Sequence, residues 1–143
     1  MAKLGKKVIH PDDVETQVFD WGTIKWMSCP SVTNAEKFTF GIVILMPGKG
    51  HAKHTHPGTE EILYVISGTG EQMVEGAEPE RTKIGPGDLV HIPPDVPHET
   101  INTGWEPLVL AAVYSPPGSE EDLKKIADKV LPPGKNPVIS ATT

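Results

Sequence analysis

The chain has 143 residues, of which 15 are Pro and 14 are Gly, together roughly a fifth of the sequence. Pro and Gly interrupt helices, so this composition excludes a helical bundle, while 37% hydrophobic residues suffice for one domain with its own core. The net charge of −6, with Arg81 as the single arginine, argues against a nucleic-acid surface. No apolar run approaches the roughly 18 residues of a membrane span. Without a secretory signal pattern or a second cysteine to pair with Cys29, we expect a cytoplasmic protein.

Short apolar segments separated by turn residues predict an all-β domain. Residues 37–46 and 107–114 have the strongest strand patterns, because they are rich in β-branched and aromatic side chains. Residues 68–70 (Gly-Thr-Gly) predict a tight hairpin turn. The strand spacing of roughly 8–12 residues is typical of a sandwich or barrel. The predicted strands are residues 19–27, 37–46, 61–67, 71–74, 81–84, 89–92, 98–102 and 107–114.

The C-terminal part differs from the β domain. Ser119 and Asp122 resemble a capping box, with Asp in place of the usual Glu or Gln. One helical face is predicted at Leu123, Ile126, Ala127 and Val130. We therefore expect a single domain made of an N-terminal strand or arm (1–36), a barrel (37–115), and a segment with a linker, one short helix and a tail (116–143). The tail, residues 139–143, is predicted to be loose.

Two strands have apolar residues on both faces. Residues 62–66 and residues 108–113 are apolar at every position, so a lone barrel would expose one face of each. The N-terminal segment, the C-terminal helix or a second copy of the chain could cover this face. We predict a homodimer.

Five of the six histidines lie between positions 51 and 98. His54 and His56 are two residues apart, which on a strand places both imidazoles on one face, and His98 begins a later strand. With Glu61, which opens the strand after the first pair, these histidines suit a divalent first-row metal with positions left open for substrate, water or dioxygen. His51 has the opposite parity to His54 and is expected to face away from the metal.

The two segments that carry these residues have fixed spacings. The first reads G-x5-H-x-H-x4-E-x6-G, from Gly48 through His54, His56 and Glu61 to Gly68. The second reads G-x5-P-x-D-x2-H-x3-N, from Gly87 through Pro93, Asp95 and His98 to Asn102. Together they resemble the two motifs of the cupin family. The one departure is Asp95, which stands where the motif has Gly, and Asp tolerates turn conformations.

The cupin resemblance implies an antiparallel jelly-roll β-barrel with a metal inside, held by His54, His56, Glu61 and His98. Glu60 is a rival for Glu61, because the motif also permits a gap of three residues. One divalent metal per chain is expected, and Mn, Fe, Ni, Co, Cu and Zn all fit these ligands. Asn102 is expected to bond a turn. The residues expected to line the pocket are Gln72, His91, Thr100 and Tyr114.

The resemblance also implies a range of activities. Cupins include dioxygenases, sugar isomerases and epimerases, decarboxylases, lyases and cyclases. We expect a mononuclear metal-dependent enzyme, an oxidoreductase or an isomerase, that acts on a small oxygenated molecule. Dioxygenase-type chemistry comes first, and isomerase, epimerase, lyase or cyclase chemistry second. A non-catalytic cupin that binds or senses a small ligand is the third reading. The sequence assigns no catalytic residue and no organic cofactor.

Overall fold

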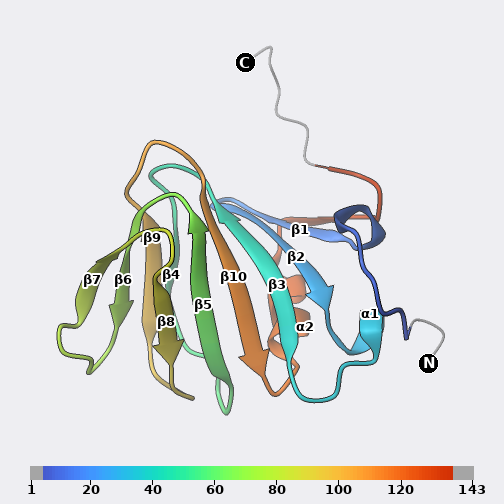
Figure 1. Cartoon of the computed structure of the whole chain (residues 1–143), viewed down its shortest axis with the longest axis horizontal. Coiled ribbons are helices and arrows are strands. Elements are labelled where there is room, and N and C mark those ends of the chain that lie inside the picture. Colours follow the sequence, from blue (N-terminus) through green and yellow to red (C-terminus); the bar gives the residue numbers. More distant parts are fainter. Residues whose placement is uncertain (1–4, 137–143) are drawn as a thin grey trace.

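The computed structural model describes residues 5–136, which form two antiparallel β-sheets packed face to face (Figure 1). The seven-stranded sheet has the order β11-β1-β2-β3-β10-β5-β8, and the four-stranded sheet has the order β4-β9-β6-β7. The strands of the larger sheet are β1 (Thr16–Phe19), β2 (Gly22–Ser28), β3 (Thr39–Leu45), β5 (Glu60–Ser67), β8 (Leu89–Ile92), β10 (Leu108–Ser115) and β11 (Lys129–Leu131). Those of the smaller sheet are β4 (Gly50–His54), β6 (Gly70–Val74), β7 (Arg81–Ile84) and β9 (His98–Asn102). The predicted all-β class is confirmed.

Within residues 5–136, three short helical segments accompany the sheets. They are the 3-10 turn η1 (Pro11–Asp13), α1 (Pro30–Thr33) and α2 (Ser119–Ile126). None of the helices formed by residues 5–136 is long and apolar enough to cross a membrane. The tail predicted at residues 139–143 lies outside the described residues.

The core fills the space between the two sheets. Along β3 and β10, buried and half-buried residues alternate strictly, as expected where one face of a strand points inward. Leu45, Val65 and Leu108 are at most 1% exposed. Several polar side chains are also buried among these apolar ones: Glu61, Gln72, His98, Thr100 and Asn102. Because burying polar groups is costly unless they have partners, these residues mark the region where a function is to be sought.

The turn at residues 68–70 corrects one expectation. β5 and β6 were predicted to form a hairpin, but they belong to different sheets, so the chain crosses the sandwich here. Gly68 adopts a φ of +84°, and a Cβ at this position would lie 2.4 Å from the Pro107 carbonyl oxygen. The crossing therefore requires glycine.

The C-terminal helix is shorter than the sequence pattern predicts. α2 ends at Ile126, which is 66% exposed, and the expectation that Val130 continues the helical face is wrong. Val130 instead lies in β11 and pairs with Gln17 of β1. The predicted capping box of Ser119 and Asp122 is also wrong, because the N-cap residue of α2 is Gly118, which has no side chain to cap the helix. The Gly118 N–H instead donates to the Glu120 carboxylate at 2.9 Å. Pairing with β1 satisfies the backbone groups that a longer helix would have used.

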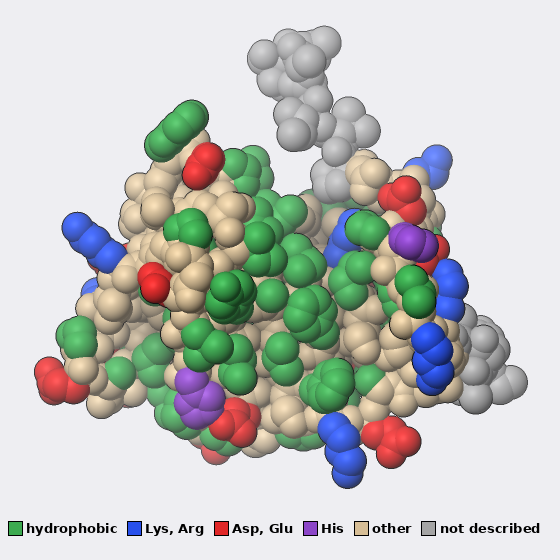
Figure 2. All heavy atoms as spheres, viewed as in Figure 1, with side chains coloured by type: hydrophobic (Ala, Val, Ile, Leu, Met, Phe, Trp, Pro, Cys, Tyr) green, Lys and Arg blue, Asp and Glu red, His purple; other side chains and the backbone are tan. Residues whose placement is uncertain are grey.

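The outer face of the larger sheet is apolar over β3, β10 and β5 (Figure 2). Tyr64 and Ile66 of β5 are 45% and 48% exposed, and Leu89 of β8 is 59% exposed. Ile42, Ile44, Val109 and Val113 are half-buried on the same face. The N-terminal segment and α2 leave this face uncovered within residues 5–136.

Candidate metal centre

Three imidazoles meet between the two sheets. His54 ends β4 and pairs in register with His98, the first residue of β9, and His56 follows two residues after His54. The ring centroids of His54 and His98 are 4.2 Å apart, and those of His54 and His56 are 4.8 Å apart. One nitrogen from each ring lies within 4.8 Å of the other two. The three rings are thus close enough to share one ion.

Backbone carbonyls fix the orientation of two of these rings. The Nδ1 atom of His54 lies 2.7 Å from the Ala52 carbonyl oxygen, and that of His98 lies 2.9 Å from the Val96 carbonyl oxygen. A carbonyl only accepts, so each Nδ1 carries the hydrogen in its bond. In the neutral rings this leaves the Nε2 lone pairs free to bind a metal, the arrangement that metal-ligating histidines usually show.

Three polar atoms in this cluster are buried without hydrogen-bond partners. They are His56 Nε2, His98 Nε2 and Glu61 Oε1. Glu61 Oε1 lies 3.2 Å from His98 Nε2 and 3.6 Å from His56 Nε2, so all three point to a common centre. A buried polar atom without a partner costs about 1–3 kcal/mol. A cation at this centre would be a partner for all three atoms. We conclude that the histidines form a three-His metal-binding site.

The site favours neutral imidazoles at two positions. Burial lowers the pKa of His54 to about 4, and burial also lowers the pKa of His56 despite the opposing Glu61 carboxylate. For His98, burial acts downward, but contact with Glu61 outweighs it and raises the pKa. Burial, together with Glu61, raises the pKa of Tyr114 well above its ordinary value. His54 and His56 are therefore in the form that a metal requires at neutral pH.

The two motif turns are tied to each other by Asp95. Its carboxylate accepts the Gly58 N–H at 2.9 Å, which connects the turn after His56 to the turn before His98. Asp95 has a φ of +66°, so the residue that departs from the motif adopts the left-handed conformation for which the motif uses glycine. The turn role predicted for Asn102 is confirmed, since its amide bonds the Leu45 and Glu106 carbonyl oxygens and its carbonyl accepts the Gly104 N–H.

The expectation that His51 faces away from the site is wrong. Its ring stacks on His54 with centroids 3.8 Å apart, and on its other side lies Trp21 at 5.0 Å. The register of β4 against β9 shifts between His51 and His54, so a β-bulge breaks the alternation on which the parity argument relied. The only sequence signal for His51 was the clustering of histidines.

Thr100 and Tyr114, two of the expected lining residues, border the cavity at His54, Glu61 and His98, which has a volume of about 30 Å³. Gln72 bonds Thr100 at 2.6 Å but borders the neighbouring cavity. His91 also borders that neighbouring cavity and is not brought to the metal centre. It is exposed on β8, and its imidazole contacts the exposed Glu60 carboxylate.

Of the two adjacent glutamates, the structure turns Glu61 inward. The Glu61 side chain is 4% exposed, whereas that of Glu60 is 54% exposed. Neighbouring residues of a strand point to opposite faces, so Glu60 cannot reach the histidines while Glu61 does.

The fold and the site together define a two-sheet β protein with a histidine metal centre. The family model of the Cupin domain matches residues 41–114. An uncharacterized protein of Methanocaldococcus jannaschii is 30% identical over 103 residues, which cover 72% of this chain and 80% of that protein. The chain belongs to the cupin family, and the predicted jelly-roll fold with a short C-terminal helix is confirmed.

Other relatives of this chain are enzymes by name. Glucose-6-phosphate isomerase of Thermococcus kodakarensis is 37% identical over 101 residues, which cover 63% of this chain and 52% of that protein. The chain thus spans about half the length of the isomerases that it matches. The structure of a Lactobacillus farciminis oxalate decarboxylase formate complex is 28% identical, with a TM-score of 0.68, and covers 76% of this chain and 33% of that one. KdgF from Halomonas sp., at 20% identity and a TM-score of 0.67 over 80% of this chain and 99% of that one, shows the fold alone.

Proposed function

We propose that this cupin is a mononuclear metal enzyme that acts on a small oxygenated substrate. His54, His56, His98 and Glu61 would hold one divalent transition metal. The observation that carries the proposal is the convergence of His56 Nε2, His98 Nε2 and Glu61 Oε1, all buried without hydrogen-bond partners. A divalent ion held by three neutral imidazoles and one carboxylate keeps a residual charge of about +1, and it would supply Lewis acidity and open coordination positions for substrate or dioxygen.

The residues around the centre have supporting roles in this proposal. The Tyr114 hydroxyl, buried beside Glu61, positions the carboxylate toward the histidines. Trp21, Leu63 and Leu110 line the cavity with apolar surface, which keeps bulk water from the metal.

Dioxygenase-type chemistry is favoured over reaction of a sugar phosphate. The one arginine, Arg81, is bound to Glu71 at 3.4 Å and to Glu99 at 3.2 Å on the outer face of the smaller sheet, away from the metal. Phosphate recognition favours arginine or lysine clusters, and the cavity at the histidines has room for about one water molecule. The second candidate is an isomerase, which the 37% identity to glucose-6-phosphate isomerase favours.

Oxygen uptake tests the proposed function directly. The protein is loaded with Fe(II) without air and mixed with diketones, catechols and thiols in an oxygen electrode. We expect uptake with at least one compound that requires both iron and the intact site, as judged against the His98→Ala protein. If uptake is absent and the loaded protein interconverts an aldose and a ketose, the isomerase is correct. Metal binding without either activity would point to a binding module.

We also propose that the apolar outer face of the larger sheet is covered by a second copy of the chain. A stable interface buries roughly 800 Å² per partner, and this face is apolar over three strands, with the exposed Glu60 at the start of β5 at its edge. We expect a dimer mass by light scattering at micromolar concentration. Replacing the half-exposed Ile66 with Glu should weaken the dimer by roughly 30-fold or more, because a charge would be buried in an apolar interface.

Ile126→Glu is the matched control for the dimer. Ile126 is an isoleucine that is 66% exposed on α2 rather than on the sheet face, so its replacement should leave the dimer intact. A monomer mass for the unmodified protein would contradict the proposed assembly.

A further inference from the structure

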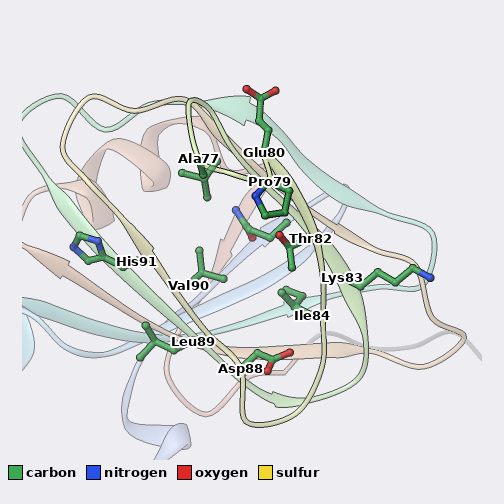
Figure 3. A pocket seen from close by; sticks show the side chains of 12 residues that line it. Ala77, Pro79, Glu80, Thr82, Lys83, Ile84, Asp88, Leu89, Val90 and His91 are labelled. Carbon is green, nitrogen blue, oxygen red and sulfur yellow. The ribbon is translucent and has the colours of Figure 1, made fainter.

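A second cavity lies beside the metal centre, where the sandwich is open at one edge (Figure 3). β7 is the last strand of the smaller sheet and β8 is the last strand of the larger sheet. The cavity between them has a volume of about 380 Å³, within the range of roughly 300–1,000 Å³ that is typical of small-molecule sites. The cavity at the histidines is far smaller, so a substrate of several carbon atoms needs additional room such as this.

The two cavities share one hydrogen-bonded pair. Gln72 borders the larger cavity and Thr100 borders the metal cavity, and the Thr100 hydroxyl donates to the Gln72 carbonyl oxygen at 2.6 Å. Both side chains are buried. The pair is therefore the boundary between the open edge and the metal centre.

The Gln72–Thr100 pair belongs to a row of paired residues that crosses all four strands of the smaller sheet. Thr82 pairs with Gln72, Gln72 with Thr100, and Thr100 with His51, one residue from each strand of the smaller sheet. Paired strands are about 4.8 Å apart, so Thr82 and Thr100 are separated by roughly 10 Å. A molecule of about that length, seated along this row, would reach from the open edge to the histidines.

The walls of the larger cavity indicate what it would bind. Val74, Ile84 and Val90 provide apolar surface, and Gln72 provides an amide at the base. Figure 3 shows Glu80 and Asp88 toward the rim, while Lys83 extends away from the cavity. This surface disfavours a phosphorylated or multiply anionic ligand.

We propose that the cavity between β7 and β8 binds the apolar body of the substrate, whose oxygen-bearing end passes the Gln72–Thr100 pair to reach the metal. The substrate class is a compact molecule with an apolar or aromatic body and an oxygen-bearing end, without phosphate, for which 4-nitrocatechol serves as a probe. This inference rests on the proposed metal site.

Filling the cavity tests the proposal. Thr82 is exposed on β7 and lines the cavity, so Thr82→Phe adds a ring there without opening the core. The protein is loaded with Co(II), and binding of 4-nitrocatechol and of azide is followed by visible absorption. We expect Thr82→Phe to raise the dissociation constant of 4-nitrocatechol by about tenfold or more, since even small changes in an apolar pocket have effects of this size. The dissociation constant of azide should change by no more than about twofold. Azide needs only an open metal position, whereas 4-nitrocatechol also needs room for its ring.

Arg81→Phe is the matched control, because Arg81 is the preceding residue of β7 and its side chain binds Glu71 and Glu99 on the opposite face. It should bind both probes as the unmodified protein does. The proposal is overturned if Thr82→Phe binds 4-nitrocatechol normally, if it loses azide equally, or if the unmodified protein binds azide but not 4-nitrocatechol. Failure of the unmodified protein to take up Co(II) would instead refute the proposed metal site.

Discussion

Replacing His98 with alanine is expected to reduce the bound metal from about one ion per chain to nearly none. His98 is 2% exposed, its ring is fixed by the Val96 carbonyl, and its Nε2 faces the centre of the site, 3.2 Å from Glu61 Oε1. Residues that merely orient a ligand typically contribute roughly 10–100-fold to metal affinity, so loss of a direct ligand should cost more. Elemental analysis after reconstitution measures the effect.

His91→Ala is the control for this result. His91 is also an imidazole on a strand of the same protein, but it is exposed, contacts Glu60 and does not line the metal cavity. Its replacement should leave the metal content unchanged. Circular dichroism would verify that the metal-free His98→Ala variant remains folded. A His98→Ala protein that retains about one ion would contradict the ligand set.

The metal-free protein should lose stability as the pH falls below about 6.5, where an unperturbed histidine becomes protonated. Burial lowers the pKa of His51 to about 3, with neighbouring imidazoles adding to the effect, and that of His54 to about 4. At pH values between these pKa values and about 6.5, His51 and His54 are protonated in the unfolded chain but not in the folded chain. The free energy of unfolding therefore decreases as the pH decreases. The raised pKa of His98 acts in the opposite direction and offsets part of the loss.

The expected loss in the free energy of unfolding between about pH 7.5 and pH 4.5 is on the order of 3 kcal/mol, after allowance for the partial exposure of His51 and His54. Urea unfolding in the presence of a chelator measures it. His51→Phe keeps a ring against Trp21 and His54 but removes one titrating group, so its pH dependence should be shallower. An unchanged slope would show that His51 does not contribute, and a loss of metal from this variant would show that His51 is itself a ligand.

The fold was predictable from the sequence because its strands are short, apolar and separated by turn residues. The four candidate ligands were predictable for a different reason. Fixed numbers of residues separate the turns from the four candidate ligands His54, His56, Glu61 and His98. Because the geometry of a turn depends on residues close together in the sequence, this spacing could be read from the sequence alone. The structure accordingly brings the three imidazoles to one centre, with the Glu61 carboxylate 3.2 Å from His98 and 3.6 Å from His56.

The remaining features depend on contacts between distant parts of the chain. Val130 continues a helical pattern, yet it pairs with Gln17, more than a hundred residues earlier. The cavity between β7 and β8 exists because β7 is the edge strand of the smaller sheet and β8 is the edge strand of the larger sheet. The residues of a strand do not show to which sheet the strand belongs. The prediction for His51 was wrong because the pairing of β4 with β9 shifts by one residue between His51 and His54, which turns the His51 side chain toward His54. The residue types in this segment do not predict such a shift.

That irregularity in β4 also bears on how relatives of this protein are aligned. The pairing shift between His51 and His54 depends on the two residues between them, Ala52 and Lys53. A relative with one residue fewer at this point would keep every motif histidine, but regular alternation would place a different side chain against His54. In the first motif such a relative would differ only by four residues instead of five between Gly48 and the first histidine, although the wall of the metal cavity would have changed from an imidazole to another group. Gaps at this position are therefore informative about the chemistry of the cavity.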